Sequence, residues 1–210
     1  MNENKPDWGD KERIKHLIER FSIMYNDLFW DSISKHISIN TPFSMLDIGC
    51  GPGLFIKEIS DRFPNATLSG LDEKQEMLDE AADRVPKAEL IKGMADENFI
   101  KSHKNKYDIV YLGLVFHELD NQINFLETVK KHLLNKGGLL IIYDFVIVPL
   151  ETYIQAHTPS KSEDEIIQRF PKPAKFTKND IKYLLKKTGW NYKESFDVIP
   201  VAALFIASSN

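Results

Sequence analysis

A glycine-rich loop directly after a buried apolar run is the feature that most constrains how this chain folds. The run covers Phe43–Ile48 and is followed by Gly49-Cys50-Gly51-Pro52-Gly53. A nearly continuous apolar run is typical of a strand buried on both faces of a parallel sheet. Glycines after such a strand let the backbone approach a ligand closely, and the helix that follows offers free N–H groups to an anionic group. The loop therefore predicts a ligand site at the carboxyl end of a central strand.

Beyond this loop, strand-like and helix-like segments alternate along the chain. Short apolar runs predict strands over 43–48, 67–71, 88–91, 107–112 and 139–145. Apolar spacings of three and four predict helices over 54–63, 73–85 and 123–134, the last capped by Gly137-Gly138. Two further strands, 192–198 and 201–208, meet at Pro200 as an antiparallel hairpin. The sequence predicts a doubly wound α/β fold around a seven-stranded, mostly parallel sheet.

The two flanks of this pattern predict the domain organisation. From Asp10, apolar residues recur at helical spacing until the breaker cluster Asn40-Thr41-Pro42, whereas residues 1–9 are polar. We therefore divide the chain into a helical cap or lid, 1–41, and a ligand-binding domain, 42–210. Within that domain, 146–176 reads as a lid-like insertion with one helix near 162–170, punctuated by Pro149, Pro159, Pro171 and Pro173. A capping-box-like start, Thr177-x-x-Asp180, opens a last helix that ends at Lys187.

Composition excludes several classes of protein. The 210 residues carry 27 Lys and Arg against 31 Asp and Glu, a net charge of −4, which argues against a nucleic-acid binder. The single cysteine, Cys50, excludes an intramolecular disulfide and a cysteine-built zinc site, and no histidine spacing forms a metal motif. No apolar run approaches the roughly 18 residues of a membrane span. The first twenty residues lack an apolar secretory segment, so the expected location is the cytoplasm.

The spacing of the glycines separates two kinds of cofactor. A dinucleotide fingerprint requires G-x-G-x-x-G, but here glycines stand at every second position and Leu54 occupies the third-glycine place. Asp47 also precedes the first glycine by two residues. The run Met45–Gly53 resembles motif I of the class I S-adenosylmethionine-dependent methyltransferases. That resemblance implies S-adenosylmethionine as the cofactor, with the loop around its amino-acid end and Asp47 supporting its ammonium group.

Further segments resemble the same family in order and spacing over about residues 42–146. Asp72, 19 residues after Gly53, ends the second strand, where a carboxylate accepts hydrogen bonds from a ribose diol; a dinucleotide site has the same feature. Where the family usually has Gly-Asp-Ala, this chain has Gly93-Met94-Ala95, so either Asp96 or backbone groups hold the adenine. The cofactor-binding residues implied by the resemblance are Asp47, Gly49, Cys50, Gly51, Gly53, Asp72, Glu73, Met77, Met94, Ala95, Asp96 and Leu112, with Met77 packing near the adenine.

One residue is a candidate for the chemistry of transfer. His117 follows the fourth predicted strand, where an acceptor would approach, and a histidine titrates near neutral pH. As a general base it takes a proton from the acceptor; otherwise it caps the next helix or lines the pocket. Glu118 is interpreted as a carboxylate at a helix start. The aromatic stripe Phe21, Tyr25, Phe29 and Trp30 serves either the core or a lid over the site.

The predicted function is transfer of a methyl group from S-adenosylmethionine to a small molecule by in-line displacement. The acceptor atom stays open among O, N, S and C. Because the sulfonium is already activated, the protein mainly aligns the reactants and excludes water, and no base is strictly required. A non-catalytic S-adenosylmethionine-binding protein and a nicotinamide-dependent oxidoreductase stay as alternatives. The sequence predicts no membrane partner and leaves the oligomeric state open, a homodimer included.

Overall fold

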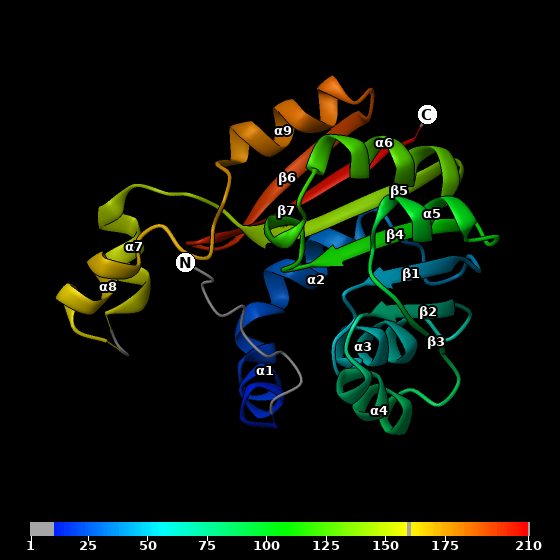
Figure 1. Ribbon diagram of the computed structural model, residues 1–210, viewed down its shortest axis with the longest axis horizontal. Helices are drawn as coiled ribbons and strands as arrows, with labels where there is room; N and C mark the ends of the chain where they lie inside the picture. The colour runs from blue at the N-terminus through cyan, green and yellow to red at the C-terminus, as the bar shows by residue number, and fades with distance from the viewer. Residues whose placement is uncertain (1–10, 159–160, 210) are drawn as a thin grey trace.

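A seven-stranded sheet forms the centre of the protein (Figure 1). The computed structural model describes residues 11–158 and 161–209, so residues 1–9, Asp10 and Pro159, on which expectations were stated, lie outside the described residues. The strand order is β3-β2-β1-β4-β5-β7-β6. The strands are β1 (Ser44–Ile48), β2 (Thr67–Asp72), β3 (Glu89–Lys92), β4 (Tyr107–Gly113), β5 (Leu134–Phe145), β6 (Asn191–Ile199) and β7 (Ala202–Ser208).

Strand pairing confirms the predicted topology. Strands β1 to β5 pair in parallel, with Ile48 opposite both Leu71 and Leu112. Strand β7 is antiparallel to both β5 and β6, which makes the hairpin at the end of the chain. The carboxyl ends of β1, β2, β4 and β5 therefore meet at one edge of the sheet, where ligands bind in folds of this kind.

Helices cover both faces of the sheet (Figure 1). One face carries α2 (Asp27–Ser34), α3 (Leu54–Arg62) and α4 (Gln75–Arg84), and the other carries α5 (Glu97–Ser102), α6 (Gln122–His132) and α9 (Lys178–Lys187). The further helices are α1 (Lys11–Met24), the 3-10 helix η1 (Phe116–Glu118), α7 (Leu150–His157) and α8 (Glu163–Arg169). This two-sided cover explains why the parallel strands read as continuous apolar runs.

The N-terminal segment is two helices, which corrects the single helical pattern expected before Asn40. The amide side chain of Asn26 interrupts it: Oδ1 accepts from the N–H of Phe29 at 3.2 Å and begins α2, while Nδ2 donates to the carbonyl of Val198 at 3.2 Å. An asparagine cap competes with helix continuation because its side chain satisfies the free N–H groups of a new helix. The turn lets α2 lie across the sheet, where Phe29 and Ile33 are wholly buried.

The predicted glycine cap of α6 is wrong. The helix ends at His132 with Leu133 as its cap, and Gly137-Gly138 lie inside β5, which begins at Leu134. The register between β4 and β5 shifts between Tyr107 and Ile109, so the glycines accommodate an irregularity in the strand. Gly137 has φ +80°, and a Cβ on Gly138 would come 3.0 Å from two backbone oxygens. Glycine here therefore marks a bulge, not a helix end.

Three short helices were not expected from the sequence. They are α5, α7 and η1, and Glu118, interpreted as a carboxylate at a helix start, lies in the first turn of η1. In contrast, the helix predicted near 162–170 is α8, and the capping box Thr177–Asp180 at α9 is present in both directions. Short helices carry too few periodic positions for the spacing of apolar residues to reveal them.

The segment between β5 and α9 forms a small lobe of α7 and α8 beside the sheet (Figure 1). Tyr153 and Ile166 pack on Val201 in a core cluster of their own. The two ends of this segment lie together, because the N–H of Ile147 donates to the carbonyl of Phe176 at 2.8 Å. The lobe therefore leaves the sheet and returns to it at neighbouring positions, and it packs on the sheet through Val201.

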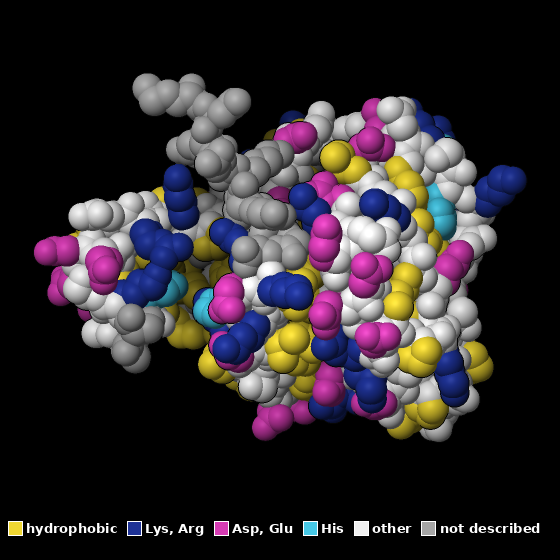
Figure 2. Space-filling view, turned by 60° about the horizontal axis from the view of Figure 1, so that its bottom comes forward, with side chains coloured by type: hydrophobic (Ala, Val, Ile, Leu, Met, Phe, Trp, Pro, Cys, Tyr) yellow, Lys and Arg dark blue, Asp and Glu magenta, His cyan; other side chains and the backbone are white. Residues whose placement is uncertain are grey.

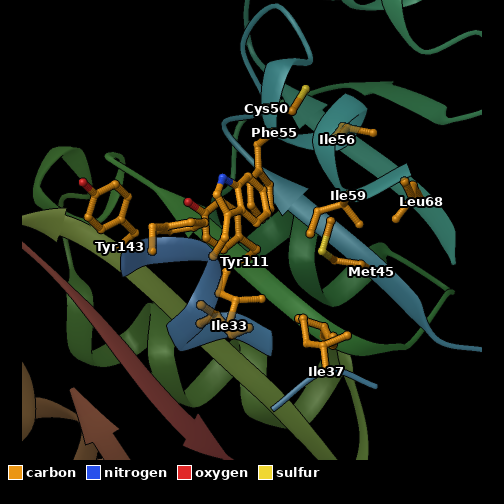
Figure 3. Packing of buried hydrophobic residues seen from close by; sticks show 14 of the residues in the cluster. Ile33, Ile37, Met45, Cys50, Phe55, Ile56, Ile59, Leu68, Tyr111 and Tyr143 are labelled. Atoms are coloured by element: carbon orange, nitrogen blue, oxygen red, sulfur yellow. The ribbon is translucent and has the colours of Figure 1, made fainter. Parts of the chain in front are cut away.

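The main core on the α2 side is rich in aromatic rings. Figure 3 shows Phe55 beside Tyr111, with Ile33 and Ile37 of the α2 region facing the same strands. The rings of Phe55 and Tyr111 stack with centroids 3.8 Å apart, and Trp30 stacks on Phe55 at 5.9 Å. This packing makes α2 part of the core.

None of the described helices is both long and apolar enough to cross a membrane. The cytoplasmic location stays a prediction.

Candidate functional site

The turn from β1 to α3 has the backbone shape that its glycines predict. Gly49, Gly51 and Gly53 have φ of +73°, +51° and +75°, in the left-handed region that favours glycine. The N–H groups of Gly49 and Cys50 both donate to the carbonyl of Leu71, at 2.7 and 3.0 Å. These bonds hold the loop against the end of β2, and Gly53 begins α3.

The loop after β4 lies directly against this glycine turn. A Cβ on Gly49 would come 2.4 Å from Cγ2 of Val115, closer than side chains approach. Val115 stands two residues before His117. The close contact brings the residue proposed for chemistry and the residues proposed for the cofactor to the same edge of the sheet.

Asp47 is the most unusual charged group at this edge. Its residue is only 2% exposed, and its carboxylate accepts no hydrogen bond from the described part of the chain. Burial, and then the negative charge of Asp72, raise the pKa of Asp47 well above its usual range. A buried carboxylate without a partner is costly, so the position suits a bound cation.

Asp72 stands beside the glycine turn, as the sequence predicts, and braces it. One oxygen accepts from the N–H of Gly51 and the other from the N–H of Lys74, both at 2.9 Å. Burial raises the pKa of Asp72, and these backbone donors counteract part of that rise. Met77 is 2% exposed, and its sulfur would lie 3.9 Å from a Cβ on Gly51. Each carboxylate oxygen keeps a lone pair for a further donor.

The third predicted segment is arranged differently from the first two. Asp96 is the cap of α5: its Oδ1 accepts from the N–H of Phe99 at 2.8 Å. Met94 is 60% exposed, Ala95 is half-buried, and Glu73 is exposed next to Asp72. The sequence analysis left two options for holding an adenine, the Asp96 carboxylate or backbone groups. In the structure the Asp96 carboxylate caps α5, a role that the sequence analysis had not assigned.

Two predicted cofactor residues have side chains in the interior. Leu112 is wholly buried in the core on the α6 side. Cys50 is 6% exposed, and burial, followed by the charges of Asp47 and Asp72, raises the pKa of its thiol above the usual range. A protonated, buried thiol behaves as a packing residue.

His117 has a partner that the sequence did not identify. Its Nδ1 lies 2.7 Å from Oδ1 of Asp144, and its backbone N–H donates to Oδ2 of the same carboxylate at 2.7 Å. Asp144 is the last residue but one of β5 and is 1% exposed, whereas the His117 side chain is 10% exposed. Burial lowers the pKa of His117. The hydrogen bond and the charge of Asp144, together with the charge of Glu118, raise it by more than burial lowers it, so the pKa of His117 lies above its ordinary value.

Three tyrosines, Tyr25, Tyr111 and Tyr143, join the N-terminal helices to this edge. The sequence analysis assigned no site role to Tyr111 or to Tyr143. The hydroxyl of Tyr111 donates to that of Tyr25 at 3.2 Å, and the hydroxyl of Tyr143 donates to the carbonyl of Met24 at 2.7 Å. Burial raises the pKa of Tyr25, and the charges of Asp47 and Asp144 add to the rise. A Cβ on Gly113 would meet the Tyr25 hydroxyl at 2.6 Å. The aromatic stripe was the sequence signal that pointed to Tyr25. Phe29 and Trp30 of that stripe belong to the core, whereas Tyr25 lies over the end of β4.

Among the described residues, a large hollow lies apart from the predicted cofactor residues. Acidic and basic side chains are interspersed over the face shown in Figure 2. A hollow of about 610 Å³ opens near the β6–β7 turn, between Val146–Pro149 and the start of α9, and it contains none of the predicted cofactor residues. Among the described residues, no group of three or more His, Cys, Asp or Glu is arranged to hold a metal ion.

Sequence comparison gives relatives for the central part of the chain. Residues 46–140 match the family described as a methyltransferase domain. Malonyl-[acyl-carrier protein] O-methyltransferase 2 of Ilyobacter polytropus is 26% identical over 122 residues, 58% of this chain and 46% of that protein. Trans-aconitate 2-methyltransferase of Agrobacterium fabrum is 32% identical over 96 residues, 46% of this chain and 36% of that protein. The matches thus span about half or less of the curated relatives' length.

Comparison with solved structures gives the same fold over nearly the whole chain. A methyltransferase from Aquifex aeolicus that depends on S-adenosylmethionine superposes with a TM-score of 0.72 at 20% identity, covering 98% of this chain and all of that one. The plantazolicin methyltransferase BpumL, solved with S-adenosylhomocysteine, gives 0.74 at 22% identity over 96% of this chain and 90% of that one. Residues 46–140 are therefore similar to a methyltransferase domain, and nearly the whole chain has the fold of these solved methyltransferases.

Proposed function

We propose that the protein transfers the methyl group of S-adenosylmethionine to a small-molecule acceptor. The observation that carries the proposal is Asp47, a buried carboxylate without a hydrogen bond from the described residues, next to the glycine turn. S-adenosylmethionine carries an ammonium group and a sulfonium, and a cation near Asp47 offsets the cost of its buried charge. When bound, the cofactor supplies a methyl group that its positive sulfur has already activated.

The predicted cofactor residues have separate roles in this proposal. The turn at Gly49, Gly51 and Gly53 surrounds the amino-acid end, and Asp72 holds the ribose while bracing the turn through Gly51. Met77 packs under the adenine. Because the Asp96 carboxylate caps α5, backbone groups around Met94 and Ala95 contact the adenine edge. Cys50 and Leu112 support the site from the interior, and Glu73 flanks Asp72 at the surface.

The similar proteins support methyl transfer but name different acceptors. Their names specify malonyl-[acyl-carrier protein], trans-aconitate and plantazolicin. These proteins share a fold and a methyl donor but differ in acceptor. Function resides in the chemical groups of each site and not in the fold, so the fold does not identify the acceptor. We therefore propose the same methyl donor for this protein and name no single acceptor.

The first test is the melting temperature of the protein with S-adenosylhomocysteine, S-adenosylmethionine and NADH in parallel. A ligand at 100 times its dissociation constant adds about 2.7 kcal/mol, which raises the melting temperature of a chain this size by roughly 5–10 °C. We expect that rise with the two sulfur compounds only. A rise with NADH alone would overturn the proposal in favour of an oxidoreductase. Binding without methyl release to water or any acceptor would favour the non-catalytic alternative.

Asp72→Ala is the matching variant. We expect that this variant stays folded and that calorimetry detects no binding of S-adenosylhomocysteine. Its free energy of unfolding should fall by about 1–3 kcal/mol, because two backbone N–H groups lose their acceptor. Asp83→Asn, on the exposed side of α4, is the control and is expected to bind normally. Unchanged affinity in Asp72→Ala would remove Asp72 from the site.

A further inference from the structure

The carboxylate of Asp144 fixes the orientation and the tautomer of His117. Oδ2 accepts from the backbone N–H of His117 at 2.7 Å, and Oδ1 accepts from the N–H of Phe145 at 2.8 Å besides meeting Nδ1 of the ring at 2.7 Å. An ionised carboxylate only accepts hydrogen bonds, so Nδ1 carries the proton of the neutral ring. The lone pair of the neutral imidazole is therefore on Nε2, the nitrogen turned away from Asp144.

This pair lies at the edge of the sheet that carries the cofactor residues. Val115 packs on Gly49, so the loop leading to His117 contacts the glycine turn. Tyr25 lies at the same edge, because a Cβ on Gly113, the last residue of β4, would meet the Tyr25 hydroxyl at 2.6 Å. The His117 side chain keeps 10% of its surface exposed, whereas Asp144 keeps 1%. The arrangement is that of a largely buried imidazole that keeps a small exposed surface and is held by a fully buried carboxylate.

We propose that His117 is a general base for an acceptor whose attacking atom is a hydroxyl oxygen, and that Asp144 is its positioning residue. The inference rests on the proposed methyl transfer and narrows its acceptor class. A carboxylate acceptor is already ionised at neutral pH and has no proton to give, so a base built in this way serves no purpose for it.

The step is balanced without any further reactant. A lone pair of the acceptor oxygen forms the bond to the methyl carbon, and the electron pair of the broken carbon–sulfur bond goes to sulfur. The hydroxyl proton goes to Nε2 of His117, and the resulting imidazolium is stabilised by the charge of Asp144. The products are the methyl ether, a neutral thioether and protonated His117, which returns its proton to solvent.

Three charged groups from different elements face His117 and determine its pH dependence. Asp144 of β5 makes the hydrogen bond, Glu118 of η1 has an oxygen 3.8 Å from Nε2, and Lys175 lies before α9. The two carboxylates raise the pKa of His117 and Lys175 lowers it, with the net result above the ordinary value. Protonated Nε2 cannot accept a proton. Turnover of a hydroxyl acceptor therefore rises with pH through this raised pKa and falls below it.

The experiment compares acceptors that differ only in the attacking group. Radiolabelled S-adenosylmethionine is supplied with 2-naphthol or 2-naphthoate, and methanol formed from water is measured in the same reactions. Wild-type protein, His117→Gln, Asp144→Asn and the control His132→Gln are compared from pH 5.5 to 9. His132 is a fair control because it ends α6 at the opposite edge of the sheet, next to the start of β4. Binding of S-adenosylhomocysteine and thermal melting establish that each variant is folded.

We expect methylation of 2-naphthol and not of 2-naphthoate. His117→Gln should lower kcat about 100-fold or more, with unchanged affinity for S-adenosylhomocysteine. Asp144→Asn should lower kcat and move the midpoint of the pH profile down by about one unit, which a merely structural role would not do. His132→Gln should match wild type. If Asp144→Asn does not fold, His117→Gln and the wild-type profile decide the matter.

Two results would overturn the inference while leaving the proposed function intact. One is methylation of 2-naphthoate at a rate that His117→Gln does not change. The other is a wild-type protein that binds S-adenosylhomocysteine but methylates neither 2-naphthol nor water, or does so equally well in His117→Gln. Failure of wild-type protein to bind S-adenosylhomocysteine would instead reject the proposed function itself.

Discussion

At the scale of a single residue, Asp47 is a buried carboxyl group whose ionisation opposes folding. The folded state raises the pKa of its carboxyl well above the usual range, first through burial and then through Asp72. Such a group favours the folded state most when it is protonated. Its contribution is present below the ordinary pKa and is lost as the pH rises towards the raised one, so at neutral pH this carboxyl group lowers the stability of the free protein.

Asp47→Asn should separate the effect of this carboxyl group on stability from its effect on binding. We expect the free energy of unfolding at pH 7 to rise by about 1–3 kcal/mol, or roughly 2–4 °C in melting temperature per kcal/mol, because a buried charge without a partner is removed. Affinity for S-adenosylhomocysteine should fall, since its ammonium group loses a counter-charge. Urea denaturation between pH 5 and 8, with Asp83→Asn as the control, measures the first effect and calorimetry the second. A variant that is less stable and binds as tightly would contradict this account.

At the scale of elements, two glycines with the same backbone conformation have different reasons to be glycine. Gly49 has φ +73° and an added Cβ would meet Val115 at 2.4 Å, so strain and a clash coincide. Gly137 has φ +80°, but an added Cβ there would meet nothing within 4 Å. The comparison separates the cost of the left-handed backbone from the cost of the close contact between the β1 and β4 loops.

Gly49→Ala should lower the free energy of unfolding by about 2–5 kcal/mol, the sum of backbone strain and overpacking. Gly137→Ala, its matched control, should cost about 1–2 kcal/mol from backbone strain alone. Urea denaturation of both variants measures the difference. Equal losses would show that the loop carrying Val115 moves aside readily and does not hold the glycine turn.

At the scale of the whole molecule, the α7–α8 lobe is joined to the sheet by ends that lie side by side. The hydrogen bond from Ile147 to Phe176 spans 2.8 Å, so a short linker replaces residues 149–174 without moving β5 or α9. Lys175 and the His117–Asp144 pair stay in place. The lobe covers Val201, which is 8% exposed.

Replacing residues 149–174 by Gly-Gly-Ser should leave binding of S-adenosylhomocysteine intact. The melting temperature should fall, because Val201 becomes exposed at a cost of roughly 1.5–3 kcal/mol. The same thermal-shift measurement with S-adenosylhomocysteine checks this, with the full chain as reference. If the ligand no longer raises the melting temperature of a folded variant, the lobe belongs to the cofactor site and the domain division at 146–176 needs revision.

The sequence by itself determined the order of the seven strands and of the helices α3, α4, α6, α8 and α9, the glycine turn, and the placing of Asp47 and Asp72 near strand ends. These features follow from local requirements: apolar periodicity, positive φ at glycine, and the place of a residue along a strand. The cofactor roles of those residues stay predictions. The tertiary structure decided the break at Asn26, the bulge at Gly137-Gly138, and the pairing of His117 with Asp144 across 27 residues. Each of these depends on a partner distant in the chain, which only packing supplies: Val198 for Asn26, strand β4 for the bulge, and a carboxylate on the next strand for His117.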